Sequence, residues 1–280
     1  KPVISGDGTS LAFLRKKPVG EDWMEHVMVA ARDGSGARTL VKFKNGFVNR
    51  VLWAGDRIVF SRVIFGKDDE GEYEENRFVS MAADGSGWKV LFSKRFRVKD
   101  GQPMAWQSIW LRDSSADART LLYAYGDLRG SWLRLRDLDS DTEHLVTRGA
   151  DDATLSPDGS RVAFAAANCF RKQCEDESWP KPGLWTVDAD GLNRRRILAT
   201  GSEVLTPDFS PDGTRIAFAS DRNAPAGDSA DEIYTITAGG KCLSWLTNGS
   251  PRSVEPSWAP EELGTAPASC GANGLRPLVE

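Results

Sequence analysis

The sequence predicts an all-β protein, a β-propeller built from four-stranded antiparallel blades. Three observations lead to this class. A tight turn followed by a short apolar strand recurs, at its clearest about 50 residues apart; a second strand pair follows each copy; and no amphipathic helix of convincing length occurs in the 280 residues. Repeated sheets of this kind are typical of propeller blades, because a single blade cannot bury both of its faces alone.

The repeated turn is clearest in the fourth and fifth units. Residues 156–164 read SPDGSRVAF, and residues 210–218 read SPDGTRIAF. Proline presets φ at the second position of a type I turn, glycine is favoured at the fourth, and the aspartate can accept a hydrogen bond from its own backbone. Weaker copies begin at Ser5, Ala54 and Ser114, and Ser257 opens a last copy that is never completed.

A second hairpin follows each turn. Asp-Gly or Gly-Gly pairs between alternating strands are strong hairpin signals. They lie at residues 33–34, 84–85, 190–191 and 239–240, with a weaker version at residues 139–141 in the third unit. Each unit therefore has four strands, and the repeats predict five blades in a single domain, residues 1–260, followed by a C-terminal tail, residues 261–280.

The first strand of the first blade has two candidate sources, residues 2–4 and residues 253–258. The second segment resembles the first strand of the other blades. A blade that is shared between the two ends of the chain removes two exposed sheet edges, so we favour this N/C-terminal closure. The alternative is a six-bladed ring with a degenerate last blade built from residues 256–279.

Composition excludes two classes of partner and favours export. A net charge of −4 predicts no broad attraction to nucleic acid, and no apolar run approaches the roughly 20 residues that cross a bilayer. The four cysteines lie in loop positions, and their even number predicts disulfides and an oxidising compartment. Of the three possible pairings, proximity favours Cys169–Cys174 and Cys242–Cys270, the second of which ties the tail to the last blade. A zinc site is disfavoured, since the C-x4-C spacing has no nearby histidine.

The motifs also carry a resemblance to a known family. The phrase S-P-D-G-x-R-[IV]-A-F, followed in the fifth unit by Glu232-Ile233-Tyr234 and by L-T-N-G at residues 246–249, resembles the WD40-like repeats of TolB-type β-propellers. The resemblance implies a propeller and an exported bacterial protein. TolB itself is a periplasmic partner of a peptidoglycan-associated lipoprotein and has an extra N-terminal domain. Nothing in this sequence matches that domain, so the resemblance does not carry the partner over.

Few residues are suited to catalysis. The two histidines, His26 and His144, are expected at the surface or rim, and the G-x-S-x-G motif of peptidases with similar propellers is absent. Five-bladed glycosidases use acidic residues at the central funnel, for which the candidates here are Asp127, Asp208, Asp221 and Glu255. We therefore predict no catalytic residues, no metal ligands and no cofactor; a structural calcium ion in the acidic segment 66–76 is the one ion that we consider.

The connections between the second and third strands of the blades are long and differ from one another, and they are expected to form loops on one face. Loops on a rigid scaffold commonly carry recognition. The binding residues that we select there are Trp23, Asp68, Asp69, Glu72, Tyr73, Phe170, Trp179, Asp221 and Arg222.

The sequence thus predicts a non-catalytic binding scaffold, periplasmic or extracellular in a bacterium, whose partner is another envelope or secreted protein. The alternative is a carbohydrate-active propeller, either a lectin or a glycosidase.

Overall fold

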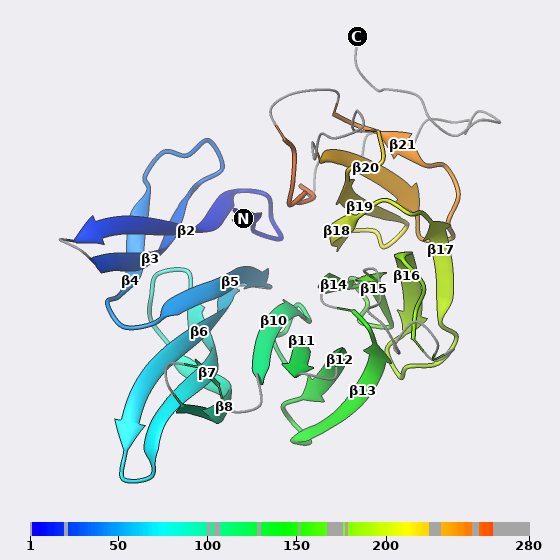
Figure 1. The fold of residues 1–280 in the computed structure, drawn as a ribbon. Coiled ribbons are helices and arrows are strands. Elements are labelled where there is room, and N and C mark those ends of the chain that lie inside the picture. Colours follow the sequence, from blue (N-terminus) through cyan, green and yellow to red (C-terminus); the bar gives the residue numbers. More distant parts are fainter. Residues whose placement is uncertain are drawn as a thin grey trace. The chain divides into compact units, whose positions relative to one another are not determined.

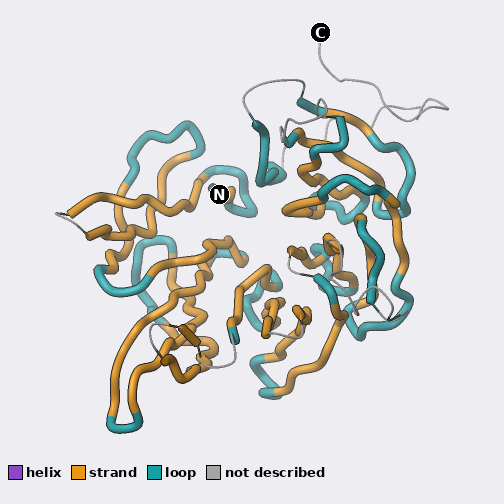
Figure 2. Tube along the Cα trace, viewed as in Figure 1, coloured by secondary structure: helices purple, strands orange, loops and turns teal. Residues whose placement is uncertain are grey.

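A computed structural model describes residues 2–19, 22–99, 102–103, 107–127, 130–150, 152–166, 176, 179–223, 231–247 and 252–259. These residues form strands and turns, and no helix occurs among them (Figure 2). It follows that no helix in this part of the chain is long and apolar enough to cross a membrane.

The strands form five antiparallel sheets, which confirm the predicted class of a five-bladed β-propeller (Figure 1). Strand order follows chain order in every sheet, and one sheet carries a short fifth strand. Blade one contains β1 (Val3–Ile4), β2 (Ser10–Val19), β3 (Asp22–Ala31) and β4 (Arg38–Phe43). Blade two contains β5 (Phe47–Ala54), β6 (Arg57–Asp68), β7 (Gly71–Ala82), β8 (Lys89–Lys99) and β9 (Gln102–Pro103).

The other three blades have four strands each. Blade three contains β10 (Ser108–Ser114), β11 (Thr120–Asp127), β12 (Gly130–Asp137) and β13 (Thr142–Arg148). Blade four contains β14 (Asp152–Leu155), β15 (Arg161–Ala166), β16 (Gly183–Asp188) and β17 (Arg195–Ala199). Blade five contains β18 (Val204–Phe209), β19 (Arg215–Ser220), β20 (Glu232–Thr237) and β21 (Ser244–Trp245).

Contacts within the chain define two compact units. Unit one comprises residues 1–130 and 136–142, and unit two comprises residues 131–135 and 143–280. Blades one and two lie in unit one, blades four and five lie in unit two, and the strands of blade three are divided between the units. The single domain over residues 1–260, followed by a tail, stays a prediction.

The repeated turn has the geometry that its residues dictate. In blade four the Gly159 N–H donates to the Ser156 carbonyl (2.8 Å), and Asp158 Oδ1 accepts from Ser156 Oγ (2.5 Å) and from the Ser160 N–H (3.0 Å). The same set of bonds recurs around Asp212 in blade five. Gly159 has a φ of +70°, in the region where a residue without Cβ is preferred.

The cores lie between neighbouring blades, and every described core cluster falls within one unit. Apolar side chains of blades one and two pack around Ile58 and Phe60, and those of blades two and three pack around Phe78 and Tyr123. In unit two, blades four and five meet around Phe218, which is fully buried. The short Val-Ala-Phe and Ile-Ala-Phe strands are buried, because side chains on both faces of these strands contact neighbouring elements. This explains why their sequence is an unbroken apolar run.

The expected closure is corrected. The first strand of blade one is β1, whose Val3 and Ile4 pair with Ala12 and Leu11. The tight turn at residues 5–8 joins β1 to β2 directly, so this pairing closes a very short loop, at a smaller entropic cost than recruiting a distant segment. Residues 252–259 form no strand in the described part of the chain.

In each unit a tryptophan side chain donates a hydrogen bond to a backbone carbonyl in the first strand of a blade. In unit one, Trp53 Nε1 donates to the Val3 carbonyl (3.1 Å). In unit two, Trp258 Nε1 donates to the Asp208 carbonyl (2.9 Å). The C-terminal segment therefore contacts β18 through the same kind of bond that β5 makes to β1.

Candidate functional site: hairpin tips and a pocket in unit one

The β2–β3 hairpin carries the most exposed aromatic side chain among the described residues. Ten-residue strands pair along their full length, and Trp23 lies opposite Pro18 near the tip. Trp23 is 59 % exposed, and Val19 beside it is 43 % exposed. Long strands with an unbroken register hold this apolar tip on a stiff support, so Trp23 remains available as an anchor for a partner.

The acidic segment 66–76 is not a loop. β6 and β7 pair continuously from Arg57–Ala82 to Asp68–Gly71, leaving only a two-residue turn, Asp69-Glu70. The acidic composition suggested a solvated loop, but the continuous register makes every residue of this segment except Asp69 and Glu70 a strand position. Asp69 and Glu72 are exposed and form no ion pair with any described residue, whereas Asp68 is paired with arginines of β8.

Arginine side chains neutralise much of the acidity of this hairpin. Arg97 donates to Asp68 Oδ1 (2.6 Å) and Arg95 donates to Asp68 Oδ2 (3.1 Å), and the bond from Arg97 is the main reason that the pKa of Asp68 falls below its ordinary value. Glu75 is buried and accepts two bonds from Arg77 (2.8 and 3.0 Å), which lower the pKa of its carboxyl. The carboxylates of Asp68 and Glu75 are therefore held in ion pairs.

Tyr73 is part of the same packing and is not a free anchor. Its ring lies against Gly66, its cross-strand partner, where a Cβ would come within 2.4 Å of the ring. The Arg95 guanidinium also lies over this ring, 3.9 Å from its centroid. An aromatic ring that covers a glycine across two strands stabilises the register of the hairpin.

Asp221 and Arg222 in unit two also have structural contacts. Asp221 Oδ1 accepts from the Glu203 N–H (2.8 Å), which joins the start of blade five to the end of β19. The Arg222 guanidinium lies 5.6 Å from the ring centroid of Tyr234, whose pKa is raised to about 12, chiefly by burial. Both residues thus contact their own blade, while Arg222 Nη1 is buried without a hydrogen-bond partner among the described residues, and their role in binding stays a prediction.

Some of the remaining residues selected from the sequence belong to the described part of the chain, and others do not. Trp179 packs against Gly149, where an added Cβ would lie 2.6 Å from the indole nitrogen. Phe170, Cys169, Cys174 and Cys270 lie outside the described residues. Cys242 has no free thiol, and the two predicted pairings stay predictions.

The described residues bring no catalytic set together. Asp127 lies in unit one, and Asp208, Asp221 and Glu255 lie in unit two. His144 Nε2 contacts the Ala189 carbonyl oxygen (2.7 Å). Within the described ranges, no three histidine, cysteine or acidic side chains gather as a metal site would require. His26, expected at the surface, is instead buried in the sheet of blade one.

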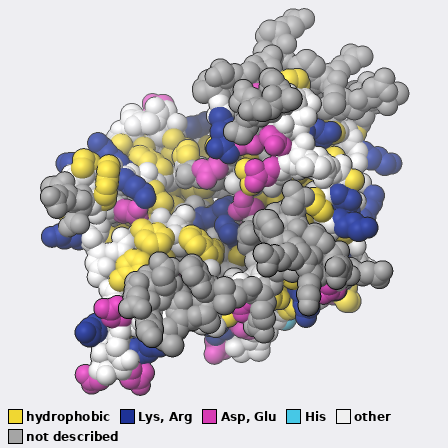
Figure 3. Space-filling model, viewed as in Figure 1, with side chains coloured by type: hydrophobic (Ala, Val, Ile, Leu, Met, Phe, Trp, Pro, Cys, Tyr) yellow, Lys and Arg dark blue, Asp and Glu magenta, His cyan; other side chains and the backbone are white. Residues whose placement is uncertain are grey.

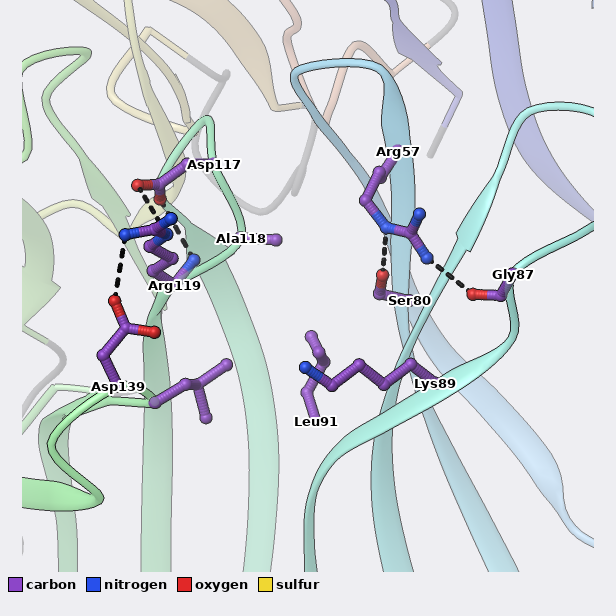
Figure 4. Close-up of a pocket in the computed structure, with 10 residues that line it drawn as sticks. Arg57, Ser80, Gly87, Lys89, Leu91, Asp117, Ala118, Arg119 and Asp139 are labelled. Carbon is purple, nitrogen blue, oxygen red and sulfur yellow. Dashed lines mark hydrogen bonds and ion pairs between the residues drawn. The ribbon is translucent and has the colours of Figure 1, made fainter.

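A pocket of about 500 Å³ lies between turns of blades two and three in unit one, and sequence reasoning missed it. Figure 4 shows two walls: Arg57 and Lys89 extend from one, and Arg119 lies between Asp117 and Asp139 on the other. Arg57 donates to Ser80 Oγ (2.5 Å) and to the Gly87 carbonyl (2.6 Å), and Arg119 donates to Asp139 (3.0 Å). Lys89 forms no ion pair or hydrogen bond through its side chain with the described residues, so its ammonium group is available to a ligand in the pocket.

No local signal identifies this pocket in the sequence. Its charged residues come from four different turns, and each turn reads as an ordinary hairpin connection. Only the packing of blade two against blade three brings them together.

Comparison with known proteins supports the fold. No model of a known protein family matches the chain. Among solved structures, a protein described as TolB from Agrobacterium tumefaciens is similar over 87 % of this chain and 78 % of its own, with 18 % identity and a TM-score of 0.59. TolB from Acinetobacter baumannii is similar over 90 % of this chain and 56 % of its own, with 15 % identity and a TM-score of 0.61.

An enzyme has a similar fold as well. Oligogalacturonate lyase from Vibrio parahaemolyticus is similar over 85 % of this chain and 61 % of its own, with 14 % identity and a TM-score of 0.52. The chain therefore has the β-propeller architecture found in TolB proteins, and the same architecture also supports catalysis elsewhere. At these identities the likeness establishes the fold alone.

Proposed function

We propose that this protein is a non-catalytic, exported binding scaffold that contacts another envelope or secreted protein through the tip of the β2–β3 hairpin. The observation that supports this proposal best is Trp23, 59 % exposed at the end of a fully paired hairpin. The other aromatic candidates of the described chain, Tyr73 and Trp179, are packed against glycines.

The physical basis is the value of a rigid aromatic anchor. Tryptophan buries a large area with only two side-chain torsions to fix, and interface anchors of this kind contribute about 2 kcal/mol or more, roughly 30-fold in affinity. The hairpin is already ordered, so a partner does not have to order it on binding. A partner with an apolar groove fits this tip.

Export and disulfides belong to the same proposal. The even number of cysteines and the resemblance to TolB-type propellers support a periplasmic or extracellular location. In this view Cys169 pairs with Cys174 and Cys242 pairs with Cys270. Mass spectrometry of the unreduced, proteolysed protein tests both pairings. The scaffold needs no cofactor, and a calcium ion at the acidic hairpin would be structural.

A second candidate function is carbohydrate binding or cleavage. The pocket of blades two and three favours it, because charged and polar side chains line a cavity large enough for a small hydrophilic ligand. Under this alternative, the Lys89→Ala variant loses binding to an acidic glycan while Trp23→Ala retains it.

The test is a comparison of three baits against envelope extract: the wild type, Trp23→Ala and Leu192→Ala. Leu192 is 62 % exposed and lies in a turn of blade four, so it matches Trp23 in exposure and controls for loss of an apolar surface group. We expect a protein that is captured by the wild type and by Leu192→Ala but lost with Trp23→Ala, and that binds again as a purified component. Equal capture by all three baits, or glycoside turnover by the purified protein, contradicts the proposal.

A further inference from the structure

A row of basic side chains crosses the sheet of blade one. The strand register places Arg15 of β2 opposite His26 of β3, and His26 opposite Lys42 of β4, so the three side chains share one face of the sheet. Lys17 lies two residues beyond Arg15 and therefore on the same face. Lysine and arginine side chains gather over β2 to β4 in the space-filling view (Figure 3).

Among the side chains that the structure describes, no acidic group pairs with these cations. Arg15, Lys17 and Lys42 form no ion pair and no side-chain hydrogen bond with the described residues. The contrast with Lys16 is informative, because Lys16 points to the opposite face and forms an ion pair with the buried carboxylate of Glu25 (3.0 Å). Like charges side by side across a sheet destabilise it, so the sheet carries this row at a cost unless an anion binds there.

His26 is unusual for its burial and for its bonding. It is 8 % exposed, and its Nε2 atom is buried without a hydrogen-bond partner. Its other nitrogen, Nδ1, lies 3.3 Å from Thr39 Oγ1. The Thr39 hydroxyl donates to the Met28 sulfur (3.1 Å), so its oxygen is left to accept from Nδ1–H. In neutral His26 the orphaned Nε2 therefore carries a lone pair, and protonation turns it into a donor.

We propose that this face of blade one is a binding site for a doubly charged tetrahedral oxyanion, such as phosphate or a phosphomonoester. Arg15, Lys17 and Lys42 supply the charge, and protonated His26 donates from Nε2 to an anion oxygen. The three exposed cations sit on long flexible stems, so they can turn aside to admit the anion and then close over it.

The chemistry favours a dianion over a carboxylate. Three unbalanced positive charges exceed what one carboxylate offsets, and a tetrahedral oxyanion presents several acceptor oxygens to donors that come from three different strands. Burial lowers the pKa of His26, and the charges of Lys42, Lys17 and Arg15 lower it further. A bound anion opposes those charges, so anion binding and proton uptake by His26 must favour each other.

The experiment follows the imidazole C–H resonances by NMR as a function of pH, with sulfate as the probe. Sulfate keeps its double charge across the whole range, so any pH dependence belongs to the protein. The chain has two histidines, and His144 in β13 serves as the internal reference. We expect saturating sulfate to raise the pKa of His26 by about one pH unit, which corresponds to about tenfold tighter binding to the protonated form, while His144 stays unchanged.

Further arms separate the sources of the anion and the role of the cations. Inorganic phosphate and glycerol phosphate distinguish a free ion from an esterified one, and acetate and chloride at matched ionic strength test for simple screening. Lys42→Gln should raise the pKa of His26 without anion and abolish most of the sulfate effect. Lys44→Gln, an identical loss of charge just beyond the end of β4, should change neither.

Two results overturn the proposal. One is an equal response of His26 and His144 to sulfate, or no response of either, in protein whose circular dichroism shows the native β signal. The other is a response to chloride or acetate as large as the response to sulfate.

Discussion

Replacing Asp158 with alanine removes the acceptor at the centre of the best-formed turn. Asp158 Oδ1 accepts from Ser156 Oγ (2.5 Å) and from the Ser160 N–H (3.0 Å), and its carboxylate also accepts from Ser160 Oγ (2.9 Å to Oδ1 and 2.8 Å to Oδ2). These bonds favour the charged form and lower the pKa of Asp158 from 3.8 to about 2; the bond from Ser156 contributes most. Alanine keeps the backbone turn but leaves those donors to water.

The magnitude follows from the shift and the exposure of the group. The difference between 3.8 and about 2 corresponds to at most roughly 2.4 kcal/mol. Because the carboxylate is exposed, solvent screening reduces this to about 1 kcal/mol. Adding the loss of the neutral part of the hydrogen bonds, we expect Asp158→Ala to lower the free energy of unfolding by about 1–2 kcal/mol at neutral pH.

The sign of the pH dependence is fixed by the direction of the shift. A carboxyl whose pKa is depressed in the folded state stabilises the protein above the unfolded-state value of 3.8, and this contribution is lost as pH falls toward about 2. The stability difference between the wild type and Asp158→Ala should therefore shrink between about pH 4 and pH 2, reaching roughly half of its charge-dependent part near pH 3.

Urea unfolding followed by tryptophan fluorescence at neutral and acid pH measures both quantities. Asp56→Ala is the matched control, because Asp56 is an exposed aspartate in the corresponding turn of blade two and its carboxylate accepts no hydrogen bond from the described residues. The reasoning is refuted if Asp56→Ala costs as much as Asp158→Ala, or if the Asp158 difference is independent of pH down to about pH 2.

Three further outcomes are expected. Gly46→Ala should lower the free energy of unfolding of unit one by at least about 2 kcal/mol or prevent folding, because a Cβ there would lie 1.7 Å from the Val63 carbonyl oxygen at a φ of +80°. The control is Gly36→Ala, at a φ of +62° with nothing near the added Cβ, which should cost only about 1 kcal/mol. Thermal unfolding measures both. Phe218→Ala should lower the free energy of unfolding by about 3–5 kcal/mol in urea, since the ring is fully buried; a cost below about 1 kcal/mol would show that the two blades do not pack around it. Spectrophotometric titration should find a tyrosine ionisation step near pH 12, assigned to Tyr234, which a Tyr234→Phe variant should lose; an unchanged titration curve in the variant contradicts the assignment.

Local chemistry made the hairpins predictable. The Pro-Asp-Gly and Asp-Gly turns fix backbone geometry within four residues, so the strand order of each blade follows from the chain alone. The expected hairpin over β20 and β21 and the repeated turns at Asp158 and Asp212 are observed as predicted. The buried Val-Ala-Phe and Ile-Ala-Phe strands were recognisable because their apolar run is bounded by turn signals.

The candidate site was less predictable because it depends on partners that are distant in the sequence. The acidic composition of residues 66–76 suggested a binding loop, but the carboxylate of Asp68 is paired with arginines nearly thirty residues away, in β8. Trp23 was recognised as a candidate anchor, and its exposure distinguishes it from Tyr73 and Trp179. His26 was expected at the surface or rim, but its side chain is buried. Only the register of three strands shows that it lies between Arg15 and Lys42.

The sequence by itself determined the blade. Turn residues set φ locally, and alternating apolar residues decide which strand face is buried. Turn geometry and the buried face therefore each depend on only a few neighbouring positions. The tertiary structure alone decided which charges meet, where the pocket of blades two and three opens, and which segment supplies the first strand of blade one. Those outcomes depend on the pairing of strands and on the packing of neighbouring blades, and short-range sequence patterns do not encode the identity of a distant neighbour.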